Sequence, residues 1–257
     1  MKMFVSISDE SALWPHFVRY YHGMGVNEFF VATLPTPPPL PAVRENVSVR
    51  TFPRIPADDM HMGGHTVTYE LRREFVGPDE WHWIADLDEF HELDRPLDQL
   101  LAQATALGCN SVGGRYIDRI TADGSLPAIG GQDLFEQFPV ECDITHKLVG
   151  AHNRKVMLIR GPLASRHIYH SLRGERPFPT EMTIYHFKWN ASVLSRLATR
   201  LRQEKENGWA HWGESKRFMN HLETHGRINI RAVRRLGFAR STAQPVRNPP
   251  SAGVAGH

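Results

Sequence analysis

The residues best suited to chemistry are three carboxylates that follow directly on an apolar segment. The segment runs from Trp81 to Ala85, and Asp86, Asp88 and Glu89 come immediately after it. In an extended chain, residues two positions apart share a face, so Asp86 and Asp88 can point the same way. Two such carboxylates repel each other unless a cation lies between them, and oxygen ligands suit Mg²⁺ or Mn²⁺. The motif therefore predicts a divalent-metal site, with a solvated acidic turn as the alternative, because short motifs also match by chance.

The elements before this motif alternate between strand and helix, which favours a layered α/β fold over an all-helical or all-β one. Ser8 and Asp9 are N-cap residue types, and Gly23 and Gly25 are expected to end the first helix. The prolines of residues 34–41 require an extended loop after the second strand. The predicted order is β-α-β-loop-β-α-β, with strands at 3–7, 28–33, 47–52 and 81–85 and a second helix at 61–75.

The second half of the chain is expected to complete one domain of residues 1–225, with a Rossmann-like mixed central sheet and a helical C-terminal extension. Residues 121–154 are turn-rich, and the strands at 155–159 and 167–171 are expected to pair. The remaining predicted elements are a helix at 96–107, strands at 110–117 and 182–187, and helices at 192–206 and 214–224.

Residues 226–257 form a basic C-terminal extension with six arginines and no acidic residue, expected to be disordered from about residue 241. Arg227, Arg231, Arg234 and Arg235 fall near helical spacing. Such a stripe could make weak contact with a membrane surface, but a solvated terminal helix is the favoured interpretation.

Composition narrows the function classes. The 257 residues contain 30 Lys and Arg against 28 Asp and Glu, so the formal net charge of +2 does not favour nucleic acid as a partner. No apolar run suits a signal peptide or a membrane span, and Cys109 and Cys142 cannot form a disulfide framework. We therefore expect a cytoplasmic protein, and nothing in the sequence fixes its oligomeric state.

Several blocks, in order, resemble the GT-A fold glycosyltransferases, specifically family-two-like members related to the former domain of unknown function 23 (the family 92 group). The most specific block is the tryptophan, apolar strand and Asp-x-Asp-Glu-Phe run that ends at Phe90. The other similar blocks are Ser8-Asp9-Glu10, Trp14 to Phe17, Tyr20 to Val26, His65 to Tyr69, Asp118-Arg119, Phe135 to Pro139, Arg154 to Val156 with His167 and His170, and Tyr185 to Trp189.

The resemblance implies transfer of a sugar from a nucleotide-diphosphate donor to a hydroxyl acceptor, and inversion at the sugar carbon is an expectation inherited from the family. The acceptor would be a glycan, a lipid-linked sugar or a small metabolite. The implied roles are metal binding by Asp86, Asp88, His170 and His186; donor binding by Glu10, Asp86 and Lys155; proton abstraction by Asp133, Glu136 or Asp118; and substrate contact by His65, Trp189, Trp209 and Trp212.

Two other functions stay open on sequence alone. A nucleotide-sugar or carbohydrate-binding protein could keep the fold without turnover, and the segment from Leu34 to Pro39, where the family usually has acidic and polar residues, allows this. A metal-dependent phosphohydrolase could also begin with Asp-x-Asp after a strand, but Glu89-Phe90 fits that class poorly. A zinc protease is disfavoured because Met62 stands where the His61 to His65 spacing would need a glutamate.

Overall fold

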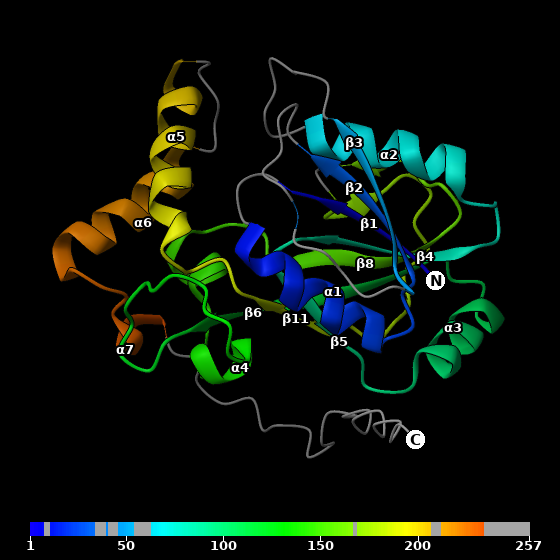
Figure 1. Cartoon of the computed structure of the whole chain (residues 1–257), viewed down its shortest axis with the longest axis horizontal. Coiled ribbons are helices and arrows are strands. Elements are labelled where there is room, and N and C mark those ends of the chain that lie inside the picture. Colours follow the sequence, from blue (N-terminus) through cyan, green and yellow to red (C-terminus); the bar gives the residue numbers. More distant parts are fainter. Residues whose placement is uncertain are drawn as a thin grey trace, which may run out of the picture.

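The structure is a computed structural model that describes residues 1–7, 11–33, 40, 46–53, 63–166, 169–206 and 212–233. Among these residues, nine strands form one mixed sheet in the order β3-β2-β1-β4-β8-β6-β11-β5, with β7 paired to β6 (Figure 1). The strands are β1 (Lys2–Ser6), β2 (Glu28–Thr33), β3 (Ser48–Pro53), β4 (Trp81–Asp86), β5 (Glu89–Glu92), β6 (Ser111–Ile120), β7 (Val140–Cys142), β8 (Arg154–Arg160) and β11 (Met182–His186). The expected α/β class with a mixed central sheet is confirmed.

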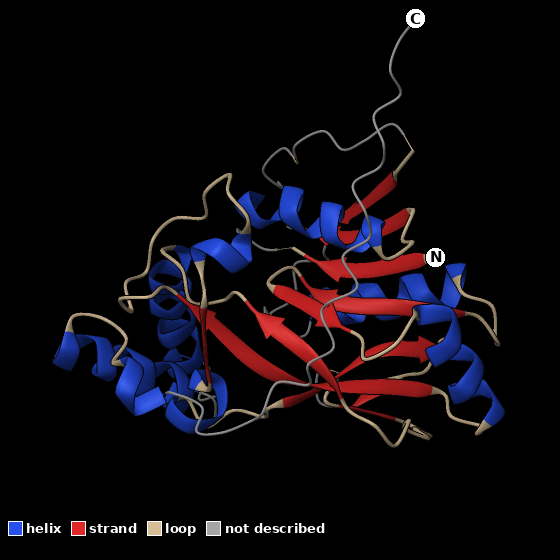
Figure 2. Ribbon diagram, turned by 90° about the horizontal axis from the view of Figure 1, so that it is seen from below, coloured by secondary structure: helices blue, strands red, loops and turns tan. Residues whose placement is uncertain are grey.

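The helices lie on both sides of this sheet (Figure 2). Alternate residues of β1 show how the faces divide: Met3 and Val5 are buried in the core that holds α1, whereas Phe4 is buried with residues of α2. Because neighbouring strand residues face opposite ways, α1 and α2 cover opposite faces. The helices are α1 (Trp14–Gly23), α2 (Gly63–Phe75), α3 (Leu97–Ala106), α4 (Leu134–Gln137), α5 (Ser192–Glu206), α6 (Trp212–His225) and α7 (Ile230–Val233).

The C-terminal helices form a third core beside the sheet. Trp189 and Phe218 pack with ring centroids 4.3 Å apart, and Val193 of α5 is fully buried in the same cluster. Ile228 and Val233 also pack there, so the first residues after 225 contact the domain. The predicted bounds of α5 match its observed bounds, and the prediction for α6 is right to within two residues at its start.

The first third follows the predicted order of elements. Of the predicted pairing between 155–159 and 167–171, the described residues show one backbone hydrogen bond, from the Val156 N–H to the Tyr169 carbonyl at 2.8 Å. The ladder partners of β8 are instead β4 and β6, and Ser171 belongs to β10 (Ser171–Leu172), which pairs with β9 (Ser165–Arg166). The turn-rich middle contains α4, β7 and a π-helix, η2 (Ile144–Leu148). The proposed caps Ser8 and Asp9, most of the proline-rich segment and the tail beyond residue 233 lie outside the described residues.

The connection between β4 and β5 is only two residues long, yet these strands are not neighbours in the sheet. Strand β5 pairs with β11, and β11, β6 and β8 lie between β5 and β4 in the order of the sheet. The short link through Leu87 and Asp88 requires this half of the sheet to curl until β5 begins where β4 ends.

In the part of the chain that the structure describes, no helix is both long enough and apolar enough to cross a membrane.

Close packing at the centre of the sheet gives the first prediction. A Cβ atom on Gly114 of β6 would lie 2.6 Å from the Met157 sulfur and 2.7 Å from Ile184 Cγ1. We expect Gly114→Ala to lower the free energy of unfolding by about 1–3 kcal/mol, because overpacking displaces neighbouring side chains. The measurement is urea denaturation, with Gly131→Ala as the control because a Cβ there meets no atom within 4 Å. Equal stability of the two variants would contradict the packing argument.

Candidate functional site

The charged residues of interest gather at one edge of the sheet. Strands β1, β2, β4, β6 and β11 run in the same direction, because β8 lies antiparallel to both β4 and β6. Their carboxyl ends therefore meet, and this is where open α/β sheets bind ligands. Asp86 is the last residue of β4 and His186 the last of β11, and His186 is paired in register with Asp118 of β6 and with Glu89 of β5.

Lys155 joins the first aspartate of the motif to Glu89. Its Nζ atom donates to Asp86 Oδ2 at 2.5 Å and to Glu89 Oε1 at 2.7 Å. Tyr116 also donates to Glu89 Oε1, at 2.5 Å, while Glu89 Oε2 accepts the backbone N–H of Asp86 at 3.0 Å. Glu89 is buried, so it fixes the position of Asp86 from behind while the Asp86 side chain stays 38% exposed.

These contacts set the protonation states of the cluster. Burial disfavours the charge on Lys155, but Asp86 and Glu89 more than compensate and hold the pKa of Lys155 above its usual value. Burial raises the pKa of Glu89, and Lys155 opposes that rise. The Lys155 ammonium therefore pairs with two carboxylates of the protein and is not positioned solely to bind a ligand.

The second aspartate belongs to a chain of hydrogen-bonding groups with His186 and Asp118. His186 Nδ1 donates to Asp118 Oδ1 at 2.9 Å, and His186 Nε2 lies 3.6 Å from Asp88 Oδ2. Burial works against the imidazolium charge, but Asp88 and Asp118 raise the pKa of His186 to about 9. Burial likewise opposes ionisation of Asp88, yet His186 and Arg196 hold the pKa of Asp88 below its usual value.

Asp118 is the fixed end of this chain. It is buried and accepts hydrogen bonds from the Thr145 N–H at 2.6 Å, the Thr145 hydroxyl at 2.7 Å and the Trp189 indole at 2.7 Å, as well as from His186. A carboxylate bonded in this way orients the imidazole and fixes which nitrogen faces Asp88. Asp118 therefore acts through His186 in this geometry; its expected role as the proton-abstracting base stays a prediction.

Two cations that the sequence did not single out lie at Asp88. Arg196 of α5 has its NH1 atom 3.8 Å from Asp88 Oδ2, and its NH2 atom donates to the Lys188 carbonyl at 3.2 Å. Lys188 also contributes to holding the pKa of Asp88 low. The available signal was that both residues follow closely on His186, but only the packing of α5 brings Arg196 to the motif.

The other expected site residues lie in several places. His170 is beside the amino end of β8, where its Nδ1 atom is 2.6 Å from the Arg154 carbonyl oxygen. Asp133 is exposed and caps α4 by accepting from the Phe135 and Glu136 N–H groups, and Glu136 is exposed on that helix. These roles remain predictions. Glu10 and Trp209 lie outside the described residues, as do the side chains of His65, in α2, and Trp212, at the start of α6.

The side chains at this edge can be compared with what a divalent metal ion needs as ligands. Among the described residues, no group of three or more His, Cys, Asp or Glu side chains converges to enclose an ion. Asp88 and His186 form a two-ligand set once His186 Nε2 gives up its proton, because only the neutral imidazole binds a metal; Asp118 supports the imidazole from behind as carboxylates commonly do at metal sites. Mg²⁺ commonly binds to one or two protein carboxylates plus substrate phosphates, so this pair fits an ion completed by a ligand.

The chain has only distant similarity to known proteins. No protein-family model matches the chain, and no curated protein matches its sequence. A structure described as a glucose-1-phosphate thymidylyltransferase from Bacillus anthracis is 8% identical, with a TM-score of 0.38 over 76% of this chain and 93% of that one. A UDP-glucose pyrophosphorylase complexed with UDP-glucose is 13% identical, with a TM-score of 0.34 over 63% and 76%. One from Acinetobacter baumannii is 11% identical, with a TM-score of 0.36 over 86% and 99%. Likenesses this distant assign no activity to the chain.

The Lys155 contacts give the second prediction. We expect Lys155→Met to lower the free energy of unfolding by about 3–5 kcal/mol, because it leaves the Glu89 carboxylate buried without its cation. The double variant Lys155→Met/Glu89→Gln should recover at least half of that loss, since no buried charge remains at position 89. Urea denaturation at neutral pH measures both. A double variant less stable than the single one would contradict this account.

Proposed function

We propose that the protein is a glycosyltransferase that moves a sugar from a nucleotide-diphosphate donor to an acceptor hydroxyl. The observation that carries the proposal is the chain of Asp118, His186 and Asp88 at the carboxyl edge of the sheet, with Arg196 beside Asp88. It combines a supported imidazole, a buried carboxylate and a guanidinium at the place where this class of sheet binds ligands. Asp118, His186 and Asp88 all lie in the sequence blocks that resemble GT-A glycosyltransferases.

The charges suit a leaving diphosphate. As the bond from the sugar to the diphosphate breaks, negative charge accumulates on the departing oxygen and must be neutralised. Arg196 and Lys188 bring positive charge to that side of Asp88, and guanidinium groups suit phosphate geometry. The half-exposed Asp86, fixed by Lys155 and Glu89, is positioned to contact the ribose and phosphate part of the donor.

Mn²⁺ or Mg²⁺ belongs to this proposal. Asp88 and His186 would hold the ion, which when bound neutralises charge on the diphosphate. The remaining work is done by the chain itself: Asp118 fixes the imidazole, Lys155 and Glu89 fix Asp86, and Arg196 binds phosphate oxygens. We propose a single in-line displacement, hence inversion at the anomeric carbon, and a cytoplasmic location where nucleotide sugars are made available.

A binding experiment tests the donor class. We expect calorimetric titration with UDP, GDP, TDP and CMP, with and without Mn²⁺, to show metal-dependent binding of one nucleoside diphosphate. Asp88→Asn should weaken that binding at least about tenfold, because it removes the charged member of the two-ligand set. Asp98→Asn, at an exposed position of α3, is the matched control and should bind like the unmodified chain.

The outcomes separate the rival functions. Metal-dependent binding followed by release of nucleoside diphosphate in the presence of acceptors supports transfer, whereas formation of pyrophosphate indicates a nucleotidyltransferase. Binding of nucleotide sugar without turnover against any acceptor indicates a silent binding protein. If no nucleotide binds while simple phosphomonoesters are hydrolysed, the transferase proposal is wrong.

Arg196 gives an independent prediction. We expect Arg196→Met to weaken the binding of that nucleoside diphosphate by about tenfold to a hundredfold, because charge-assisted hydrogen bonds to phosphate are lost. The corresponding monophosphate should change much less, since it lacks the outer phosphate. Arg202→Met, an exposed position on the same helix, controls for general charge. Equal losses for monophosphate and diphosphate would show that Arg196 does not contact the outer phosphate.

A further inference from the structure

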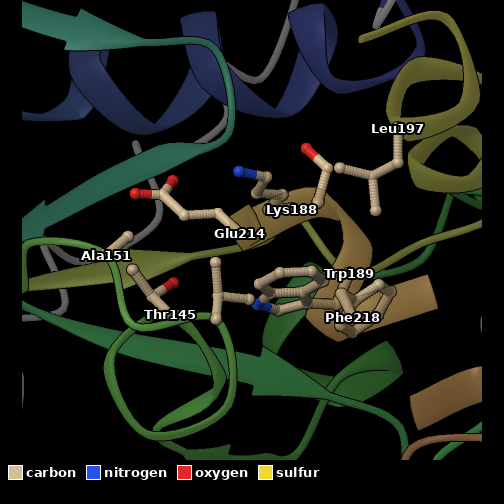
Figure 3. Close-up of a pocket in the computed structure, with 9 residues that line it drawn as sticks. Thr145, Ala151, Lys188, Trp189, Leu197, Glu214 and Phe218 are labelled. Atoms are coloured by element: carbon tan, nitrogen blue, oxygen red, sulfur yellow. The ribbon is translucent and has the colours of Figure 1, made fainter. Parts of the chain in front are cut away.

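The Asp118 carboxylate accepts hydrogen bonds from groups outside the strands of the sheet. The N–H and hydroxyl groups of Thr145, in η2, donate to it at 2.6 and 2.7 Å, and the Trp189 indole, just after β11, donates at 2.7 Å. Figure 3 shows Trp189 packed on Phe218, with Thr145 on the neighbouring segment. Because Asp118 orients His186, the position of η2 helps to determine the geometry of the candidate site.

The form of η2 makes the Thr145 N–H group available to Asp118. η2 is a π-helix, in which an N–H group bonds to the carbonyl five residues earlier, as the Val149 N–H does to the Ile144 carbonyl at 2.9 Å. The first N–H groups of a helix have no partner within the helix, and Thr145 is the second residue of η2. The Asp118 carboxylate satisfies this group, so a shift of η2 would break the contact.

The start of η2 is held by residues 226–233, which we call the C-terminal segment. The Asp143 N–H, directly before η2, donates to the Val233 carbonyl at 3.0 Å. The side chains of Val233 and Ile228 are each 1% exposed and belong to the core that the C-terminal helices form beside the sheet. Burial of these two side chains therefore fixes the acceptor of the Asp143 N–H group.

Two further hydrogen bonds attach the C-terminal segment to the domain. The Ile228 N–H donates to the Gly124 carbonyl at 2.9 Å, and the Asn229 N–H donates to His221 Nε2 at 3.0 Å. Gly124 has a φ of +77°, and a Cβ atom there would lie 2.1 Å from the Ile228 carbonyl oxygen. Only glycine allows so close an approach, so the turn after β6 is shaped to receive the segment.

Arg217 of α6 holds the end of η2. Its Nε atom donates to the Val149 carbonyl at 2.7 Å, and its Nη2 atom donates to the same oxygen. Gly150 follows, and a Cβ atom there would lie 2.9 Å from Arg217 Nη2. The π-helix is thus anchored at its start by the C-terminal segment, at its end by α6 and in its first turn by Asp118.

We propose that the C-terminal segment and Arg217 are positioning elements of the candidate site, which hold η2 where Thr145 fixes Asp118. Among the described residues, neither element has a hydrogen bond to Asp118 or His186, so both act through η2. The geometry of the site therefore depends in part on chain beyond residue 225, where the domain was expected to end. This role does not depend on which ligand the site binds.

NMR of the full chain tests this coupling at the Thr145 N–H group. We expect Ile228→Ala to move the Thr145 amide proton resonance upfield, because its charge-assisted hydrogen bond lengthens, and to speed its exchange with solvent at least about tenfold relative to Val193→Ala. Val193 of α5 is fully buried in the same core, so both variants leave a cavity there and only one removes an anchor of η2. Ile228→Val, which keeps most of the side chain, should restore slow exchange.

A second variant repeats the test without altering the core. Arg217→Met should change the Thr145 resonance and exchange in the same direction, and Arg227→Met, which removes an exposed charge from the C-terminal segment, is the control. If Ile228→Ala does not fold, Arg217→Met decides the question alone. The proposal is overturned if Thr145 behaves in Arg217→Met as it does in Arg227→Met, or in a folded Ile228→Ala as it does in Val193→Ala.

Discussion

The balance of buried charge at the carboxyl edge of the sheet is the constraint on which the rest of the site depends. Asp88, Glu89 and Asp118 are buried carboxylates, and Lys155 and His186 are the buried groups that balance them. Charges removed from water are tolerated only when they are paired and hydrogen-bonded. These residues come from β5, β6, β8, β11 and the link before β5, so the pairing requirement also fixes how the strand ends meet.

This balance divides the motif into two unequal halves. Asp86 is tied to Lys155 and Glu89 and is held rigidly from behind, while Asp88 faces His186 and Arg196 at distances longer than a hydrogen bond. The tight half provides a fixed frame, and the looser half is held by charge attraction at 3.6–3.8 Å rather than by short hydrogen bonds. A site prepared in this way needs little rearrangement when a charged ligand arrives.

The local part of this arrangement was predictable from the sequence. Apolar periodicity, helix-ending glycines and the prolines placed β4, the helices and the motif at the end of a strand, because those signals act over a few residues. The partners within the site were not predictable in the same way. Lys155 joins Asp86 across 69 positions and His186 joins Asp118 across 68, and no periodicity encodes such pairs.

The resemblance named His186 as a metal ligand and Asp118 as one of three candidate bases; the hydrogen bonds of Asp118 show in addition that it orients His186, which the sequence did not predict. A surrounded carboxylate and an exposed one look identical in a sequence, and only packing distinguishes them. The same holds for Arg196, which lies on a mixed-charge helix and reaches Asp88 because α5 packs beside the end of β11. Tertiary packing, rather than local pattern, selects which charged residues matter.

The two-residue link between β4 and β5 has a consequence for the order in which the chain assembles. Strands β1 to β4 can pair with one another as soon as residue 86 is available, but β5 finds its partner only in β11. A growing chain that has not yet reached His186 can therefore hold the parallel half of the sheet and the whole acidic motif without the surroundings that neutralise it. Contacts between distant parts of a chain form slowly because loop closure must come first. The acidic motif is made early in synthesis, and its binding geometry is among the last features of the fold to form.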